Sequence, residues 1–322
     1  MTSTRILVTG GGGYLGSQVV ASLALAPIDG GCVVSLDVRE TPAERRLPGV
    51  VYAAADIRER APLEALLREH RIDTVVHLAA IVTPGRKADR NFEYQVDVVG
   101  TKNVLDACVA ARVGHVVISS SGAAYGYHAD NPAWLTEDCT LRGNEAFAYA
   151  HHKRLVEEML ARWRTEHPAL KQVVFRIGTI LGETVRNQIT ALFEKPRLIA
   201  LRGADSPFVF IWDQDVVGCL LRAIETDKTG IYNVAGDGVL TIHEIAAKLG
   251  KRCLVLSPGL LRLALRLLKS LGLTQYGPEQ VDFLRYRPVL DNSRLKNEFG
   301  YVPRLSSAQV FDLYRKSLQH GA

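Results

Sequence analysis

The chain has 322 residues, of which 47% are hydrophobic and 23% charged, and its formal net charge is +5. This length fits one α/β unit with a smaller appended lobe. The basic residues form no long block, so we expect no nucleic-acid partner, and no apolar run approaches the roughly 20 residues that cross a bilayer. Five cysteines without a CxxC pair, and a strand that begins within four residues of the N-terminus, leave no sign of a secretory signal and predict a cytoplasmic protein.

Short apolar runs alternate with amphipathic stretches through the first two-thirds of the chain. Six runs are typical of buried parallel strands: residues 5–9, 32–37, 50–54, 74–78, 115–119 and 172–177. Helical patterns lie between them, at residues 14–26, 60–70, 92–112 and 145–167. Repeated β-α-β units predict a Rossmann-type doubly wound parallel sheet, with ligands at the carboxyl ends of its strands.

Beyond residue 178 the pattern breaks into shorter pieces. We expect helices at residues 213–226, 241–250 and 258–272, and a strand at 231–234. Residues 1–178 are therefore predicted to form the nucleotide-binding domain, and residues 179–322 a smaller substrate-binding lobe that is partly interleaved with the first.

Three glycines, Gly10, Gly13 and Gly16, stand where the first predicted strand meets the first predicted helix. A backbone that a pyrophosphate approaches closely needs residues without Cβ, and a helix N-terminus favours the phosphate charge. Asp37 ends the second strand, where a carboxylate can accept hydrogen bonds from ribose hydroxyls and would repel a 2′-phosphate. We therefore expect NAD as the cofactor, with NADP as the less favoured alternative because Arg39 lies two residues on.

Two more polar residues follow predicted strands. Asp56 can face the adenine amino group or cap the helix predicted near residue 60, and the sequence does not separate these alternatives. His77 ends a predicted strand, close to the predicted cofactor site. No HxxxH or Cys/His spacing occurs among the nine histidines, so no metal site is predicted.

Tyr149 and Lys153 are four residues apart on a predicted helix, and hence on one face of it. Using a tyrosine as a base near neutrality requires lowering its pKa from about 10, at a cost of about 4 kcal/mol. A neighbouring ammonium and an oxidised nicotinamide both act in that direction. Ser121, just beyond the fifth strand, can polarise the substrate oxygen. The spacing of His151 and His152 turns them away from Tyr149, so we expect them on the surface or in a dimer contact.

These motifs together resemble the extended short-chain dehydrogenases/reductases, the NAD-dependent epimerase/dehydratase superfamily. The matching segments cover nearly the whole chain in the expected order: residues 9–16, Asp37, 56–57, 77–80, 100–101, 119–126, Tyr149 with Lys153, 176–182, 212–216 and 232–236. The resemblance implies a catalytic set of Ser121, Tyr149 and Lys153, and often a dimer, here through the helices near 92–112 and 145–165. For His77 it implies positioning rather than chemistry. It implies these cofactor-binding residues: Gly10, Gly13, Tyr14, Leu15, Gly16, Asp37, Asp56, Ile57, Leu78, Ala79, Ala80, Tyr149 and Lys153.

Departures from the family pattern reduce the number of reactions that we expect this chain to catalyse. Sugar-nucleotide dehydratases carry an Asp-Glu pair where this chain has Gly122 and Ala123, so we do not expect a dehydratase. UDP-sugar epimerases usually have an Asn where Thr179 stands and a diphosphate-binding Arg where Phe208 stands. The candidates for substrate contact are Thr83, Gly122, Ala123, Thr179, Arg202 and Phe208, and either Arg202 or Arg294 can replace the missing cation. Asp97 replaces a common Asn that helps to position the catalytic set.

The segment at residues 260–271 is rich in leucine, with Arg262, Arg266 and Lys269 on one helical face. The favoured interpretation is a helix packed on the core with a solvated basic stripe. The alternatives are contact with an anionic membrane surface and a lid over an apolar substrate.

The leading hypothesis from the sequence is an NAD-dependent oxidoreductase that transfers hydride at a secondary alcohol or ketone of a small-molecule substrate, with Tyr149 as acid and base. The first alternative is a nucleotide-sugar 4-epimerase of the UDP-glucose/galactose type that keeps its NAD tightly bound. The second is a non-catalytic sensor that binds NAD and a protein partner. A homodimer is expected in each case.

Overall fold

The computed structural model describes residues 4–25, 31–82, 89–226, 228–274 and 277–320. The chain forms two compact units. The first contains residues 1–121, 148–176 and 216–232, and the second contains residues 122–147, 177–215 and 233–322. Compared with a division at residue 178, residues 122–147 and 177–178 belong to the second unit and residues 216–232 to the first.

A seven-stranded sheet is the centre of the first unit, with the strand order β10-β6-β5-β4-β1-β2-β3. The strands are β1 (Arg5–Thr9), β2 (Cys32–Asp37), β3 (Val50–Ala54), β4 (Thr74–His77), β5 (His115–Ser121), β6 (Lys171–Ile177) and β10 (Gly230–Val234). The pairs β1·β2, β1·β4, β2·β3 and β4·β5 are parallel. The predicted Rossmann-type α/β class is confirmed.

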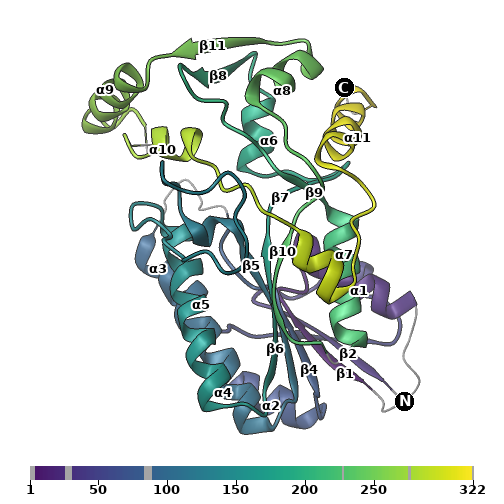
Figure 1. Cartoon of the computed structure of the whole chain (residues 1–322). Coiled ribbons are helices and arrows are strands. Elements are labelled where there is room, and N and C mark those ends of the chain that lie inside the picture. The colour runs from purple at the N-terminus through teal and green to yellow at the C-terminus, as the bar shows by residue number, and fades with distance from the viewer. Residues whose placement is uncertain (1–3, 26–30, 83–88, 227, 275–276, 321–322) are drawn as a thin grey trace. The chain divides into compact units, whose positions relative to one another are not determined.

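Helices cover both faces of this sheet, α2, α4 and α5 on one side and α1 and α7 on the other (Figure 1). Their bounds are α1 (Tyr14–Leu25), α2 (Arg60–Glu69), α3 (Arg90–Tyr94), α4 (Thr101–Ala111), α5 (Ala148–Glu166) and α7 (Asp213–Glu225). The helix expected at 92–112 is interrupted by a π-helical segment, Gln95–Gly100. Buried aliphatic side chains of the strands, such as Leu7, Val75 and Val116, pack with those of α4 and α5, such as Leu105 and Leu160.

The second unit contains two small parallel sheets, β7–β9 and β8–β11. Its strands are β7 (Thr179–Leu181), β8 (Arg197–Leu201), β9 (Phe210–Trp212) and β11 (Arg252–Leu256), and its helices are α6 (Gln188–Phe193), α8 (Ile242–Leu249), α9 (Pro258–Ser270), α10 (Gln280–Arg285) and α11 (Ser307–His320). Short 3-10 or π-helical turns occupy Ala43–Arg45, Gly122–Tyr125 and Leu295–Phe299. The core of the second unit is rich in aromatic side chains and includes Phe193, Phe208, Phe210, Phe311 and Tyr314.

Helix α9 differs from the favoured interpretation of residues 260–271. No residue of this helix is fully buried, and Leu260, Leu263, Leu267 and Leu271 are between 52% and 69% exposed. The polar face instead contacts α10, where Arg262 pairs with Asp282 and Lys269 with Glu279. The prediction of a core-packed helix is therefore wrong. No helix in the described part of the chain has the length and hydropathy needed to cross a membrane.

Candidate active site

The turn between β1 and α1 has steric reasons for its glycines. Gly10 has φ +68°, in the left-handed region, and a Cβ there would lie 2.8 Å from the backbone nitrogen of Ala79. A Cβ on Gly16 would overlap the carbonyl oxygen of Gly10, which accepts a hydrogen bond of 2.9 Å from the Gly13 N–H. Only glycine lets α1 begin this close to β1. The turn is thus a bare backbone cradle at a helix N-terminus, the form that fits a dinucleotide pyrophosphate.

Asp37 is held against this turn at the carboxyl end of β2. Its Oδ2 accepts from the Gly12 N–H at 3.1 Å and its Oδ1 accepts from the Arg39 N–H at 3.2 Å. The carboxylate therefore lies beside the pyrophosphate cradle, where it would meet the ribose hydroxyls of a bound NAD.

Asp56 binds its neighbour rather than a helix end. The Arg58 guanidinium donates to Asp56 Oδ2 at 2.5 Å and 2.9 Å, and this hydrogen bonding lowers the pKa of the Asp56 carboxyl. Helix α2 begins at Arg60 with Glu59 as its N-cap, so the capping alternative for Asp56 is wrong. Ile57 is buried against Gly100, where an added Cβ would lie 2.7 Å from the Ile57 Cδ1.

His77 connects the ends of two strands and one helix. Its Nδ1 lies 2.7 Å from Thr9 Oγ1 and its Nε2 lies 2.9 Å from Thr101 Oγ1. Because the Thr101 hydroxyl donates to the Asp97 carbonyl, we infer that it accepts from a protonated Nε2 of His77. Burial lowers the pKa of His77 to about 3, so the ring is neutral. The contacts suit the predicted positioning role. They fix the strand end from which Leu78, Ala79 and Ala80 continue.

The structure brings together Ser121, Tyr149 and Lys153, the three residues predicted to be catalytic. Tyr149 and Lys153 lie on α5, with the Lys153 Nζ 5.7 Å from the centre of the Tyr149 ring. The Lys153 ammonium donates to the Ser119 carbonyl oxygen at 2.8 Å, which ties α5 to the end of β5. Tyr149 is hydrogen-bonded to the Ser121 side chain. A substrate oxygen can therefore meet two hydroxyl groups with an ammonium close by.

The pKa of Tyr149 differs from expectation. The Tyr149 pKa is raised to about 12; desolvation is the largest cause, the hydrogen bond with Ser121 lowers the pKa, and the charge of Asp97 raises it. Burial also lowers the pKa of Lys153, against the effect of Asp97 and Glu157. The pKa of Tyr149 in the protein without cofactor is therefore raised and not lowered, against the prediction. A further positive charge beside the phenol, such as that of an oxidised nicotinamide, would lower it.

Comparison with known proteins agrees with this geometry. The family model described as the NAD-dependent epimerase/dehydratase family matches residues 6–235. The chain belongs to this family. It is an enzyme of the extended short-chain dehydrogenase/reductase type, as predicted, and the predicted cofactor, NAD, is the one named in the family description.

The sequence identities to individual relatives are low. An uncharacterized protein of Mycobacterium bovis is 27% identical over 313 residues, which cover 96% of this chain and 82% of the relative. A UDP-glucose 4-epimerase of Azospirillum brasilense is 32% identical over 183 residues, or 56% of this chain and 50% of the relative. The solved structure of a Thermus thermophilus UDP-glucose 4-epimerase complex with NAD has 25% sequence identity and a TM-score of 0.74. The match covers 99% of this chain and 100% of that chain.

A buried Asp–His pair in the epimerase/dehydratase site was missed from the sequence. His152 is 1% exposed, so its prediction as a surface or dimer-contact residue is wrong for the single chain. Its Nδ1 lies 3.0 Å from Asp97 Oδ2, and Asp97 Oδ1 accepts from the Ile81 N–H at 2.8 Å. Asp97 thus holds both the chain after β4 and the catalytic helix. The sequence had marked Asp97 as a departure from the family's usual Asn, but nothing in it paired Asp97 with His152.

Asp97 gives a testable pH dependence. Because its negative charge raises the pKa of Tyr149, the variant Asp97→Asn should have a lower Tyr149 pKa. Hydride transfer from an alcohol needs the deprotonated tyrosine, so the alkaline rise of the single-turnover rate should move to lower pH. Stopped-flow formation of NADH across a pH series measures this shift. Asp106→Asn serves as control, because Asp106 is a half-buried acidic residue of α4 that pairs with Lys102. An unchanged or higher midpoint for Asp97→Asn would contradict the assignment.

The residues predicted to contact substrate in the second unit have different surroundings. Gly122 is buried, and a Cβ there would lie 3.0 Å from Leu290 Cδ2; Ala123 follows it in the same 3-10 turn. Thr179 begins β7, and Phe208 is 3% exposed inside the aromatic core. Arg202 is exposed. Thr83 lies outside the described residues.

Arg287 is a buried cation of the second unit that the sequence did not single out. Its guanidinium carbon lies 4.0 Å from the centre of the Phe208 ring and 4.2 Å from that of Phe283. Its Nε and Nη2 are buried and have no hydrogen-bond partner among the described residues. Arg294, by contrast, lies 3.4 Å from Asp138 and 3.3 Å from Glu298. Burial lowers the pKa of Arg287 to about 10, which still leaves it charged near neutrality.

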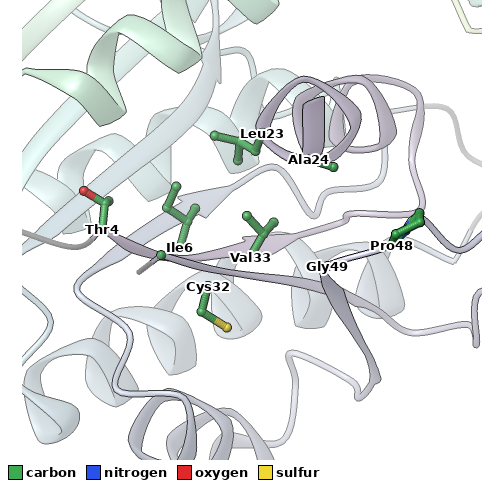
Figure 2. Close-up of a pocket in the computed structure, with 9 residues that line it drawn as sticks. Thr4, Ile6, Leu23, Ala24, Cys32, Val33, Pro48 and Gly49 are labelled. Carbon is green, nitrogen blue, oxygen red and sulfur yellow. The ribbon is translucent and has the colours of Figure 1, made fainter. Parts of the chain in front are cut away.

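A pocket at the opposite edge of the first unit's sheet is separate from this site. It has a volume of about 270 Å³ and lies at the amino ends of β1 and β2, with Thr4, Ile6, Leu23, Cys32 and Val33 among its lining residues (Figure 2). Ligands of doubly wound sheets bind at the carboxyl ends of the strands, so we leave this pocket out of the candidate site.

Proposed function

We propose that this enzyme removes hydride from a secondary alcohol of a nucleoside-diphosphate sugar and returns it, as a nucleotide-sugar 4-epimerase does. Tyr149 takes the hydroxyl proton and gives it back, while the Ser121 hydroxyl hydrogen-bonds the same oxygen. Lys153 would hold the ribose of a bound NAD, and its positive charge favours the tyrosinate. When bound, NAD accepts the hydride at its nicotinamide ring.

The observation that carries the choice of substrate is Arg287. A buried guanidinium with two unsatisfied N–H donors is costly, and a phosphate oxygen would satisfy both donors at once. Phe208 replaces the usual diphosphate-binding Arg, but Arg287 lies against its ring and can supply the same charge. Similarity to the UDP-glucose 4-epimerase of Thermus thermophilus supports the same substrate class.

The net dehydrogenase is the second candidate, because Thr179 and Phe208 depart from the epimerase pattern. A panel of UDP-sugars and simple secondary alcohols separates the two, with NADH followed by absorbance and the sugars by NMR. Interconversion of C4 epimers without accumulation of NADH supports the epimerase. Net NADH formation on a simple alcohol would establish the dehydrogenase, and NAD-dependent binding of a protein without turnover would establish the sensor.

Arg287→Gln should raise the KM for a UDP-sugar roughly ten- to a hundredfold, with a much smaller effect on kcat, because a charge-assisted hydrogen bond contributes about 1.5–3 kcal/mol. UDP alone should raise the melting temperature of the wild type and not of the variant. Arg202→Gln is the matched control, since Arg202 is exposed and was the candidate from the sequence. If Arg202→Gln loses the UDP effect and Arg287→Gln retains it, the anion site is at Arg202.

The homodimer through α3, α4 and α5 also remains a proposal. Phe92 and Tyr94 of α3 are 44% and 38% exposed in the single chain, which is suitable for such an interface.

A further inference from the structure

Helix α9 presents its leucines outward. Leu260, Leu263, Leu267 and Leu271 share one face because residues three and four apart lie side by side on a helix. The opposite face carries Arg262, which pairs with Asp282 of α10 at 2.5 Å, and the helix begins at Pro258 directly after the strand β11. The ion pair thus holds the polar face of α9 against α10, and the apolar face of α9 is exposed to water.

Basic residues accompany this apolar face. The segment 251–274 contains five basic residues and no acidic one: Lys251, Arg252, Arg262, Arg266 and Lys269. No hydrogen bond or ion pair joins the side chains of Arg252 and Arg266 to any residue that the structure describes. The segment therefore combines an exposed leucine surface with unneutralised positive charge.

The two-stranded sheet next to α9 gives an independent indication of an anionic partner. In the register of β8 and β11, Arg197 lies directly opposite Arg252, and both are exposed. Like charges at opposed positions of adjacent strands destabilise a sheet unless an anion lies near them. Two residues further along, Ile199 is opposite Leu254, and these are 42% and 43% exposed. One face of the sheet thus repeats the combination found on α9.

We propose that α9 and the β8–β11 sheet form a peripheral binding surface for an anionic lipid bilayer. Leucines that enter the boundary between headgroups and acyl chains, with arginines at the phosphates, are the mode of interfacial amphipathic helices. A second copy of the chain would bring the same positive charges together across a two-fold interface. A nucleic acid would satisfy the arginines and leave the leucines exposed. Only a lipid surface matches both components.

The test is co-sedimentation of the full chain with vesicles of phosphatidylcholine alone and of phosphatidylcholine mixed with phosphatidylglycerol. The wild type should pellet with the anionic vesicles, and each basic residue in contact should strengthen partitioning by about fivefold. High salt should release the protein, because the Debye length falls to about 3 Å at 1 M. The double variant Leu263→Glu with Leu267→Glu should bind at least roughly tenfold more weakly, since it removes buried apolar area and adds negative charge.

Val302→Glu is the matched control, because Val302 is an exposed apolar residue of the same unit, 65% accessible. It should bind anionic vesicles like the wild type, and unchanged melting temperatures show that the variants are folded. Wild-type protein that stays in the supernatant, or that pellets equally with neutral vesicles, overturns the proposal. So does a lipid-free dimer that the leucine double variant dissociates, because the face would then belong to a second copy. Since this assay needs neither NAD nor a sugar, its result is separate from that for the proposed function.

Discussion

Tyr149→Phe is expected to lower the kcat for the substrate about a thousandfold, within the range of about 10²–10⁴ that positioned acid–base groups contribute. The Tyr149 phenol is hydrogen-bonded to Ser121 and has the Lys153 ammonium 5.7 Å from its ring centre, so it is placed to take and return the proton. Phenylalanine keeps the ring, so the packing of α5 against the sheet should be retained. Steady-state kinetics on the best sugar of the UDP panel measures the effect.

Binding of NAD separates a lost proton transfer from a lost site in this variant. The glycine turn and Asp37 are untouched, so NAD affinity measured by calorimetry should change only a few-fold. Tyr52→Phe is the control, because the Tyr52 hydroxyl accepts from the Leu47 N–H on the exposed side of the first unit. Full activity of Tyr149→Phe on an identified substrate would rule out the proton-transfer role.

The strands and motifs of the first unit could be predicted because each depends on a few neighbouring residues. A parallel strand buried on both faces is a continuous apolar run, and β1, β2 and β3 begin and end at the residues expected. The glycine turn and the Tyr149–Lys153 spacing are likewise read within a few residues. The strands β7 and β9 have three residues each, too few to show alternation, and none of the four strands β7, β8, β9 and β11 was anticipated.

The parts of the site that were missed depend on contacts between distant segments. Asp97 and His152 are 55 positions apart and meet only because α5 packs against the π-helical segment. Arg287 meets Phe208 only once the second unit has folded. The prediction that His152 points away from Tyr149 also misjudged the helix, because residues three apart lie side by side on it. His152 is covered by Asp97 of the π-helical segment. Periodicity gives the direction of a side chain and not what lies in that direction.

Glu157→Gln is expected to destabilise the first unit by about 3 kcal/mol or more, the low end of the range for breaking a buried ion pair. Glu157 on α5 and Arg176 on β6 are each 4% exposed. Arg176 donates from Nε and Nη2 to the carboxylate at 2.7–3.0 Å, and the Ser120 hydroxyl donates to it at 2.5 Å. Removing the negative charge takes away the carboxylate to which this buried guanidinium donates. Urea denaturation should show a lower midpoint with an unchanged slope.

The next residue supplies a close control for this loss. Glu158 is on the same helix, but its side chain is 55% exposed and its ion pair with Arg154 is on the surface, so Glu158→Gln should change stability by less than about 0.5 kcal/mol. The double variant Glu157→Leu with Arg176→Leu removes both charges and should be more stable than Glu157→Gln, since an apolar pair leaves no charge unpaired. If the double variant is less stable than Glu157→Gln, the cluster stabilises the unit mainly through its hydrogen bonds, which link Ser120, α5 and β6. The balance of charge would then matter less. In that case the cluster's main effect is to hold α5, and with it Tyr149 and Lys153, in register with the end of β5.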